Sequence, residues 1–370
     1  MSSKRVVTKR NEISHNNRPR QYVLEIETGI VKKLRTVPRH WLPTKTTAVF
    51  DTYWRFAAER QAIFFRRLRA DREPWTEDPI LFEHKFTNVY RASDRVSQYL
   101  IRHVIYEGSQ EPKEVLFRTL LFKTFNKIET WELLIRELGE VSWKEFDFRL
   151  YDSVFSKAQK AKKSIYSAAY IMPSGGRAFG HKIKHRNHLD LIKTMMEEDL
   201  TGHVCDAKTM QEVFELLRGY PMIGDFLAYQ YATDINYSVL TDFNEMSFVV
   251  PGPGAKDGIR KCFSDLGGLT EVDLIKLMAD RQESEFERLE LDFQSLWGRP
   301  LQLIDCQNLF CEVDKYARVA HPEIEGLTGR TRIKQKFRPK ATPIDYFYPP
   351  KWKINDAIFH TQGAKKIELS

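Results

Sequence analysis

Apolar side chains recur every three or four residues over several long stretches of the chain, which is the spacing of one face of an α-helix. The first stretch covers residues 48–72, where aromatic and aliphatic residues alternate with arginines. The same pattern occupies residues 83–107, 115–138 and 209–231. Alternating β-branched positions, which indicate strands, are scarce. The sequence therefore predicts a mainly α-helical fold.

Glycine, proline and charged residues mark the segments between these predicted helices. Residues 174–188 are rich in glycine and basic residues and predict an exposed loop, and residues 249–255 (VVPGPGA) predict a tight turn. Both segments are candidates for contact with phosphate. Residues 330–353 combine basic side chains with aromatic residues and prolines, which favours a segment that wraps on the body of the protein.

The N-terminal twenty residues carry six basic residues against one glutamate and almost no large apolar side chains, so residues 1–20 are predicted to be a flexible basic arm. We expect one helical domain over residues 21–353 and a C-terminal tail over residues 354–370, because neither an internal repeat nor a clean linker is visible. Whether the domain is one body or two lobes with a cleft between them stays open.

Composition and charge narrow the class of partner. With 370 residues, 42% of them hydrophobic and 12% aromatic, the chain can bury a large core. This composition excludes a chain that is disordered over its whole length. The 58 lysines and arginines exceed the 50 aspartates and glutamates, so the formal net charge is +8. This excess of positive charge favours a polyanion as the binding partner, and nucleic acid is the first candidate. A charge that only keeps the protein soluble is the alternative.

The four cysteines form no CxxC pair and no spacing typical of a zinc site or a disulfide framework, so we expect reduced thiols. The sequence also shows neither an N-terminal signal pattern nor an apolar run of about 18 residues. We therefore expect a cytoplasmic protein with no membrane partner, and nothing in the sequence predicts an obligate protein partner.

One glycine-rich motif, GGRAFG at residues 175–180, has the glycine spacing of a phosphate-binding loop. Such a loop continues with lysine and then serine or threonine, whereas histidine, lysine and isoleucine follow here, so a kinase-type loop is not predicted. His181, His185 and His188 lie among basic residues that would repel a cation. No metal site and no other cofactor are therefore predicted.

Residues 216–230 (LLRGYPMIGDFLAYQ) predict a helix, a short turn and a second helix, which is the outline of a helix-hairpin-helix. A glycine such as Gly224 in this turn lets backbone N–H groups at a helix N-terminus approach a DNA phosphate without reading the base sequence. An ordinary helical hairpin carries the same residue types, and this alternative stays open.

The apolar segment 116–130 ends in a polar cluster that includes Asn126 and Lys127. In its pattern and its distance from the predicted hairpin, this segment resembles the helix of helical DNA glycosylases whose amide side chains fill the base stack where the target base has been flipped out. Solvated residues at an ordinary helix C-terminus are the alternative.

Two further polar clusters lie where apolar residues would be expected. One predicted helical stripe carries Asn88, Arg91, Arg95 and Gln98. A second helical face carries Asp305, Asn308 and Glu312. Buried ion-pair networks between helices are the alternative explanation for both clusters.

Five strings of the chain together resemble a known family: FTNVYRASDRVSQYLI, LLFKTFNKIETWELL, IGDFLAYQYATDINYS, FVVPGPGAKDGIRKCF and LIDCQNLFCEVDKYAR. They look like the helical domain shared by alpha-glutamyl/putrescinyl thymine pyrophosphorylases and 5-hydroxymethyluracil DNA kinases. The resemblance covers about residues 82–353. It implies a helix-hairpin-helix, DNA-glycosylase-like fold that acts on hypermodified pyrimidines, in a family that includes viral DNA-modification enzymes and antiviral glycosylases.

The resemblance also bears on the chemistry. The kinases of this family carry an additional phosphate-binding-loop domain that this sequence lacks, so kinase activity is not expected. In helical glycosylases the catalytic aspartate follows the hairpin glycine, and counting from Gly224 leads to residues 242–245, where the usual V-D-T motif is missing. A carboxylate must stabilise the oxocarbenium-like state in glycosidic cleavage. The candidate acids are Asp305, Glu245, Asp234 and Asp257.

The sequence thus predicts a DNA glycosylase that flips a hypermodified pyrimidine, such as glucosylated hydroxymethylcytosine or a hydroxymethyluracil derivative, out of viral double-stranded DNA and excises it in antiviral defence. The alternatives are a transferase acting on pyrophosphorylated hydroxymethyluracil and a non-catalytic binder of modified DNA. The residues expected to contact the DNA or the base are Asn88, Arg91, Arg95, Gln98, Asn126, Lys127, Asn236, Tyr237, Gly224, Gly252, Gly254, Lys256, Gln307, Asn308 and Lys315.

Overall fold

The computed structural model describes residues 20–23, 26–27, 30–31, 35–38, 44–338 and 344–368. Nearly all of the predicted basic arm, residues 1–19, lies outside the described residues. Helices make up most of the structure and the strands are short, so the predicted mainly α-helical fold is confirmed.

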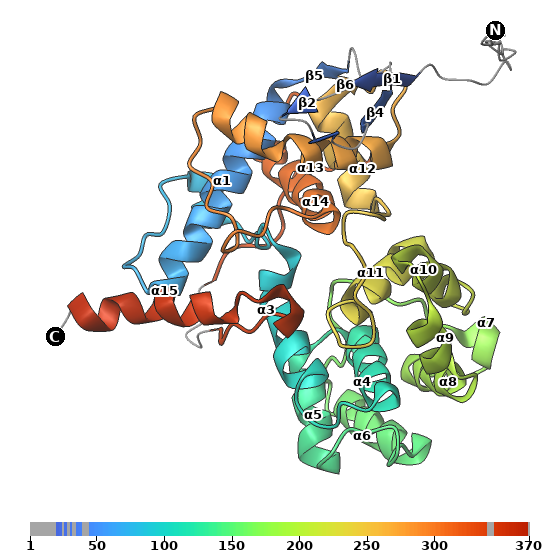
Figure 1. Ribbon diagram of the computed structural model, residues 1–370. Coiled ribbons are helices and arrows are strands. Elements are labelled where there is room, and N and C mark those ends of the chain that lie inside the picture. Colours follow the sequence, from blue (N-terminus) through green and yellow to red (C-terminus); the bar gives the residue numbers. More distant parts are fainter. Residues whose placement is uncertain are drawn as a thin grey trace, which may run out of the picture.

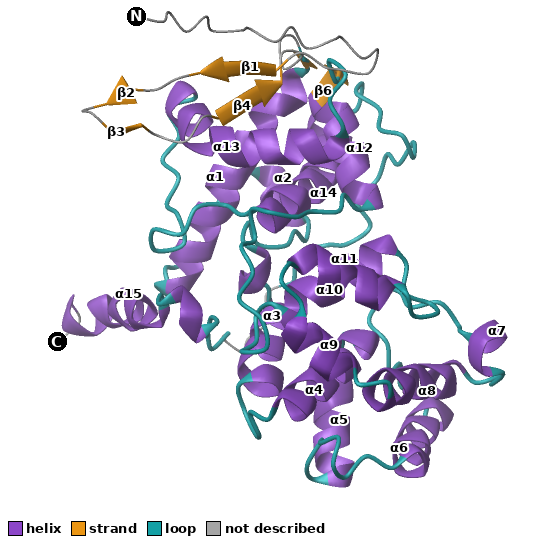
Figure 2. Ribbon diagram, turned by 45° about the vertical axis from the view of Figure 1, so that its right-hand side comes forward, coloured by secondary structure: helices purple, strands orange, loops and turns teal. Residues whose placement is uncertain are grey.

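The helices form two lobes, one above the other in Figure 1 and Figure 2. The first lobe contains α1 (Ala48–Leu68), α12 (Pro253–Cys262), α13 (Glu271–Arg288) and α14 (Leu303–Ala320). The second lobe contains α4 (Pro112–Phe125), α5 (Ile128–Leu138), α6 (Phe148–Lys160), α8 (Lys184–Glu197), α9 (Leu200–Asp206), α10 (Met210–Arg218) and α11 (Asp225–Ile235). The chain therefore leaves the first lobe after α1, builds the second lobe, and returns to the first at α12.

Short antiparallel strand pairs lie on the outer side of the first lobe (Figure 2). The pairs are β1 (Arg20–Val23) with β4 (Arg35–Pro38), β2 (Ile26–Glu27) with β3 (Ile30–Val31), and β5 (Lys45–Thr46) with β6 (Phe263–Asp265). The last pair attaches the start of α1 to the end of α12.

The helix α1 begins and packs as its sequence pattern predicts. The side-chain oxygen of Thr47 accepts a hydrogen bond from the Val49 backbone N–H at 3.1 Å and caps the helix N-terminus. Tyr53 and Trp54 are fully buried, and the Trp54 ring meets Phe286 of α13 edge to face with 5.2 Å between centroids. These contacts join α1 to α13 in the core of the first lobe.

The helices α12 and α14 approach closely because α12 carries a glycine at their contact. A Cβ atom at Gly258 would lie only 2.0 Å from the Phe310 carbonyl oxygen of α14. Any other residue at this position would force the two helices apart. The close contact fixes α14 relative to α12.

The second lobe is built around α4, which buries nearly all of its residues. The helix ends at Asn126, whose backbone is left-handed with φ of 49°, so α5 starts in a new direction. The predicted helical pattern over residues 115–138 therefore corresponds to two helices. The predicted helical hairpin is present, because α10 and α11 are joined by a turn that ends at Gly224, the residue that caps the N-terminus of α11.

The chain between the lobes is less regular than predicted. Residues 83–107 do not form one helix; the elements there are α2 (Pro79–Glu83), a 3-10 turn (Arg91–Ser93), α3 (Arg95–Tyr99) and a π-helix (Leu100–Ile105). The prediction that four polar side chains of this region share one helical stripe is therefore wrong.

Two carboxylates explain this interruption. The Asp94 side chain accepts a hydrogen bond from the Asn88 backbone N–H at 2.7 Å. The Asp305 side chain, from α14, accepts one from the Arg91 backbone N–H at 2.8 Å. Backbone donors that bond to side chains cannot join a helical ladder, so the segment stays irregular.

Residues 174–188 are more regular and more buried than the predicted exposed loop. They contain the short helix α7 (Gly176–Phe179) and the start of α8, and His185 and His188 are fully buried. The two ring nitrogens of His188 lie 2.7 Å from the Pro173 carbonyl oxygen and 2.8 Å from the Tyr166 hydroxyl. Burial lowers the pKa of His188 to about 4, so this histidine is neutral and adds no charge to a phosphate-binding surface.

The predicted turn over residues 249–255 runs directly into α12, which starts at Pro253. The predicted aromatic wrap is present: Tyr348 is fully buried, and its ring stacks on Trp352 with 5.9 Å between centroids. The predicted C-terminal tail is instead largely a helix, α15 (Asn355–Glu368), which projects from the side of the molecule in Figure 1 with Phe359 72% exposed.

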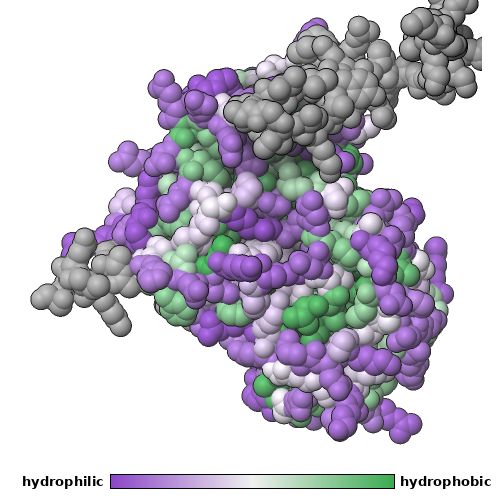
Figure 3. All heavy atoms as spheres, in the orientation of Figure 1, coloured by the Kyte–Doolittle hydropathy of each residue, from purple (hydrophilic) through white to green (hydrophobic). Residues whose placement is uncertain are grey.

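The face of the molecule shown in Figure 3 is mainly hydrophilic, and apolar residues gather there only in small areas. Within the described residues, no helix combines the length and the apolar character needed to cross a membrane. All four cysteines lie in this part of the chain and are free thiols, as predicted.

Candidate functional site

A pocket of about 530 Å³ lies between the two lobes. Its lining comes from α14 of the first lobe, from α4 and α11 of the second, and from residues 85–97 and 167–170. Pockets of this size accommodate ligands such as a nucleoside. Because both lobes contribute, the pocket exists only where they meet.

The floor of this pocket is a buried carboxylate between two cations. Asp234, in the last turn of α11, has one carboxylate oxygen 2.7 Å from Arg91 Nη1 and the other 2.8 Å from Lys123 Nζ. The three side chains are almost completely buried. Among these three side chains two positive charges meet one negative charge, and this excess of positive charge suits a ligand with electron-rich oxygens.

The surroundings set the protonation of all three groups. Burial opposes ionisation of Asp234, but Arg91 and Lys123 outweigh it and lower the pKa of the carboxyl. Burial likewise opposes the charge of Arg91, and Asp234 outweighs it and raises the Arg91 pKa. For Lys123 burial is the larger effect and lowers its pKa to about 8, although Asp234 acts in the opposite direction. At neutral pH the floor therefore contains an ionised carboxylate and a lysine close to its titration range.

One wall of the pocket is aromatic. The rings of Tyr170 and Phe226 are nearly parallel, at 10°, with 5.7 Å between centroids. Lys123 Nζ lies 3.9 Å from the centroid of the Tyr170 ring, a cation–π contact that also orients the lysine. A flat apolar wall beside polar groups is the arrangement that holds a planar base.

Amide side chains supply hydrogen-bonding groups around the floor. Gln230 accepts a hydrogen bond from Arg91 Nε at 3.0 Å and so holds the guanidinium group in place. Gln307 and Asn308 of α14 and Asn126 at the end of α4 also line the pocket. Amides both donate and accept hydrogen bonds, as reading of the polar edge of a base requires.

The rim of the pocket is basic. Lys85 is exposed, while Arg95 and Lys315 are half-buried. Lys315 lies 2.7 Å from Glu312 and 4.7 Å from the centroid of the Phe86 ring, so its position is well defined. Cations at the mouth of a pocket suit the phosphates that flank a base in DNA.

The structure brings together part of the predicted site and adds to it. Of the predicted residues, the pocket is lined by Arg91, Arg95, Asn126, Asp234, Gln307, Asn308 and Lys315. Four further residues line the pocket and were not predicted from the sequence: Lys123, Tyr170, Phe226 and Gln230. A signal for Lys123 was present, because a lysine inside the apolar string LLFKTF is expensive to bury unless a partner meets it.

Three candidate acids have structural partners and do not line the pocket. Asp305 accepts hydrogen bonds from the backbone N–H groups of Arg91 and Gln302, at 2.8 and 3.0 Å. Glu245 lies 2.6 Å from Arg299. Burial raises the pKa of Asp305 to about 7 and also raises that of Glu245.

The third, Asp257, accepts hydrogen bonds from the backbone N–H and the hydroxyl of Thr328. These contacts join separate chain segments in the first lobe. Asp305, Glu245 and Asp257 therefore have structural roles in the fold, and Asp234 is the candidate acid that the structure places at the pocket.

Other residues predicted to bind DNA are engaged in the fold. Gln98 bonds to the Ala92 carbonyl and to the Phe347 backbone N–H, both at 2.7 Å. The Asn236 side chain accepts a hydrogen bond from the Phe243 N–H at 2.9 Å. Asn88 donates from its side chain to the Ser93 carbonyl at 2.6 Å.

Two more predicted residues lie close to the site without lining it. Tyr237 is buried and accepts a hydrogen bond from Arg91 Nη1 at 3.1 Å, so it supports the guanidinium group from behind the floor. Lys127 donates to the Ser164 carbonyl.

The glycines of the predicted phosphate loop are close-packed. A Cβ atom at Gly252 would lie 2.8 Å from the Phe226 ring, and one at Gly254 would lie 3.1 Å from Cys311 Sγ. Lys256 is exposed on α12. The need for glycine here is explained by packing behind the aromatic wall of the pocket.

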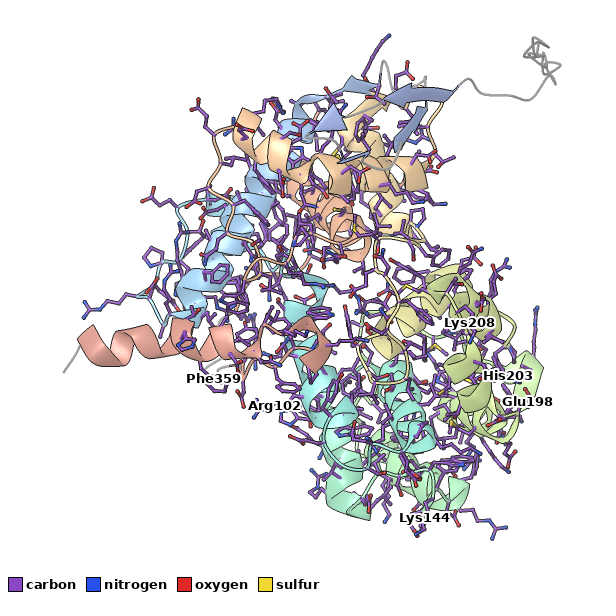
Figure 4. The ribbon with its side chains drawn as sticks, viewed as in Figure 1. Arg102, Lys144, Glu198, His203, Lys208 and Phe359 are labelled. Atoms are coloured by element: carbon purple, nitrogen blue, oxygen red, sulfur yellow. The ribbon has the colours of Figure 1, made fainter. Side chains whose placement is uncertain are left out.

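Within the described part of the chain, no group of three or more His, Cys, Asp or Glu side chains is placed to hold a metal ion. A shallow hollow around His203 lies at the outer edge of the second lobe, where Figure 4 shows the labelled side chain. Asp206, Glu212 and Glu215 line this hollow, and their charge would repel DNA. The pocket between the lobes is therefore the candidate site for a nucleic-acid ligand.

The fold and the pocket define a mainly helical protein with a pocket between two lobes that is lined by cationic and aromatic side chains. A sequence model of the family "5-hmdU DNA kinase, helical domain" matches residues 47–326, so the chain belongs to this family. The 5-hmdU DNA kinase of Bacillus phage SP10 is 27% identical over 329 residues, which are 83% of this chain and 51% of the relative. The chain thus spans about half the length of this curated relative. No solved structure matches the chain.

These comparisons correct the predicted function. A family and a relative named as DNA kinases belong to the transferases, so the prediction of a base-excising glycosylase, a hydrolase, is wrong. The predicted antiviral role depended on base excision, so it is no longer supported. The family is defined by its helical domain, which this chain contains, so the departure of residues 175–180 from a phosphate-binding loop does not exclude membership of the family.

Proposed function

We propose that this chain binds double-stranded DNA and holds a 5-hydroxymethyluracil base in the pocket between its lobes, where the 5-hydroxymethyl group is the acceptor in a transferase reaction. Membership of the 5-hmdU DNA kinase family supports the class of reaction and of substrate. The single observation that carries the proposal is the ionised Asp234 between Arg91 and Lys123 on the pocket floor.

The floor matches what transfer to a hydroxyl requires. In phosphoryl transfer the hydroxyl oxygen forms a bond to phosphorus, the bond from phosphorus to the leaving group breaks, and the hydroxyl proton must be accepted. Asp234 is the group proposed to accept that proton, because its carboxylate is ionised at neutral pH. Arg91 and Lys123 would stabilise the negative charge on the oxygens in the transition state.

The walls and the rim of the pocket are proposed to bind the parts of the substrate other than the hydroxymethyl group. A base that has left the duplex would stack on the wall formed by Tyr170 and Phe226. Amide groups such as Gln307 would bond to its polar edge, and Lys85 and Arg95 would bind the flanking phosphates. The proposal assigns to this chain the recognition of the acceptor base. It assigns no binding site for the phosphoryl donor.

A second candidate is a transferase that acts on pyrophosphorylated hydroxymethyluracil and displaces the pyrophosphate. The excess positive charge of the floor favours it, because Arg91 and Lys123 together can bind more anionic oxygen than a neutral hydroxymethyl group presents. The two candidates use the same pocket and differ in the form of the base that binds more tightly.

The test is the affinity of the purified chain for duplex oligonucleotides that differ at one base: thymine, 5-hydroxymethyluracil or its pyrophosphorylated form. Fluorescence anisotropy measures binding, and intact mass after incubation with ATP detects transfer. We expect at least about tenfold tighter binding of a modified duplex than of the thymine duplex. Asp234→Asn should abolish any mass gain. Equal affinity for all three duplexes would overturn the proposal. Selective binding of a modified duplex would support it, and a mass gain with ATP would in addition assign the phosphoryl-donor site to this chain.

A further inference from the structure

A second pocket, of about 370 Å³, lies beside the first and shares Phe86 with it. One side is formed by α1, and the other by a short ribbon in which residues 83–85 pair with residues 335–337. The Phe337 N–H donates to the Glu83 carbonyl at 2.9 Å, and the Lys85 N–H donates to the Gln335 carbonyl at 3.0 Å. The pocket is therefore held by regular backbone contacts, and none of its lining belongs to the Asp234 floor.

A buried arginine lies in the lining of this second pocket. Arg60 of α1 is 7% exposed, and its Nε donates to the Thr87 carbonyl at 2.9 Å. Its Nη1 is buried and forms no hydrogen bond with any described residue. The carboxylates of Asp94 and Glu312 interact favourably with the Arg60 charge, but they leave this donor atom without an acceptor. A buried donor without an acceptor costs free energy, and an anionic ligand that bonds to Nη1 would offset that cost. Nδ1 of His84, also in the lining, is buried and lacks a hydrogen bond to the described residues in the same way.

The same pocket also has an aromatic surface. The Arg67 guanidinium carbon lies 4.9 Å from the centroid of the Trp75 ring and 6.0 Å from that of Phe337. The two rings meet edge to face at 76°, with 6.4 Å between centroids. Arg67 thus brings a second positive charge to an aromatic wall, a combination that suits a planar ring carrying an anionic group.

We infer that this second pocket binds one nucleotide, with the base against Trp75 and Phe337 and the phosphate at Arg60 and Arg67. The same chemistry is presented by a free mononucleotide and by a nucleotide within a DNA strand. The inference does not rest on the proposed function, because the two pockets use different charged residues.

Isothermal titration calorimetry with AMP and dTMP tests the inference, with adenosine and inorganic phosphate as the separate halves of the ligand. We expect both nucleotides to bind at least about tenfold more tightly than either half, because charge and stacking act together. Arg60→Met should weaken nucleotide binding about tenfold or more, and Trp75→Leu several-fold. The matched control is Arg55→Met, on the same helix and exposed, which should change nothing.

Two further variants keep the result decisive. If Arg60→Met does not fold, as thermal unfolding would reveal, Arg67→Gln at a half-buried position should give the same loss of affinity. Asp234→Asn should leave nucleotide binding intact. Loss of binding in Asp234→Asn, unchanged binding in both arginine variants, or no binding of either nucleotide by the wild type would overturn the inference.

A single-stranded pentathymidylate distinguishes the two sources of the ligand. If the pocket takes a nucleotide of a DNA strand, the oligonucleotide should compete with dTMP and lose affinity in Arg60→Met. If it takes a free nucleotide, the variant should lose dTMP binding and keep oligonucleotide binding. Both results support a nucleotide site.

Discussion

Two buried regions of this protein contain carboxylates, and their partners differ in kind. Asp234 faces a cavity and lies between the cations of Arg91 and Lys123. Asp305 lies outside that cavity and bonds to two backbone N–H groups. Although burial opposes both negative charges, the cations lower the pKa of Asp234, whereas that of Asp305 is raised to about 7. The difference teaches that a buried acid marks a site only when a cavity and counter-charges accompany it.

The largest expected effect comes from removing the carboxylate between the two cations. Asp234→Leu leaves Arg91 and Lys123 buried without their counter-ion and should lower the free energy of unfolding by about 3–5 kcal/mol. Urea unfolding measures this loss. Adding Lys123→Met should recover part of the stability, since it removes one of the unpaired charges. A double variant less stable than Asp234→Leu would contradict this account of the floor.

The corresponding change in the other region should cost less. Asp305→Ala removes the acceptor for the backbone N–H groups of Arg91 and Gln302, and we expect a loss of about 2 kcal/mol in the free energy of unfolding. The folded fraction should still prefer 5-hydroxymethyluracil over thymine in DNA. If this variant loses that preference while it remains folded, the division into a site acid and a structural acid is wrong.

The two acids should respond to pH in opposite directions. The folded state keeps a proton on Asp305 up to about pH 7, while an unperturbed aspartate releases it near 3.8, so this group's contribution to stability falls as pH rises through that window. Asp234 has a lowered pKa and stabilises the fold above the unperturbed value, so its contribution falls on acidification. Unfolding free energies of the wild type, Asp305→Asn and Asp234→Asn between pH 3 and 8 would separate the two contributions.

A smaller effect, on DNA binding, is expected when Lys123 loses its charge at alkaline pH. Its pKa is lowered to about 8 by burial, so its positive charge is lost as pH rises through 8. Binding of the modified duplex should weaken several-fold between about pH 7 and 9. The variant Lys123→Met should bind weakly at both values and show no such dependence. A wild-type profile that stays flat would remove Lys123 from the binding site.

The smallest effect belongs to the rim. Lys315→Gln should weaken DNA binding only a few-fold and equally for modified and unmodified duplexes, because a phosphate contact carries no information about the base. The slope of log affinity against log salt should decrease in magnitude by about 0.9 for each contact removed. A change in base preference would place Lys315 inside the pocket, next to the base.

The sequence predicted the features that depend on residues close together along the chain, and it did not predict those that depend on contacts between distant residues. The mainly helical fold, α1 and the hairpin of α10 and α11 follow from local periodicity and were predicted. The irregular segment before α3 was not, because one of the two carboxylates that interrupt the helix there, Asp305, is more than two hundred residues away along the chain. The Asp305 side chain bonds to the Arg91 backbone only in the folded protein, and no local pattern contains that information.

The site was predicted in part for the same reason. Arg91 and Asn308 belong to polar clusters at positions where apolar residues would be expected, and Asp234 is one of the candidate carboxylates, so all three were predicted. Tyr170 and Phe226 are indistinguishable in sequence from core aromatics, and only the fold shows that they form a pocket wall. The choice among the acidic residues also required the structure, since the sequence pattern does not show that Asp234 lines a cavity between two cations and that Asp305 bonds to backbone N–H groups outside it.

The measurement that tests the central claim most directly is the ratio of affinities for duplexes with 5-hydroxymethyluracil or its pyrophosphorylated form and with thymine at one position, determined for the wild type, Asp234→Asn and Asp305→Asn. The account predicts a ratio of at least about tenfold for the wild type and Asp305→Asn, and a ratio near one for Asp234→Asn. A wild type that does not discriminate, or an Asp234→Asn variant that discriminates as well as the wild type, would contradict it.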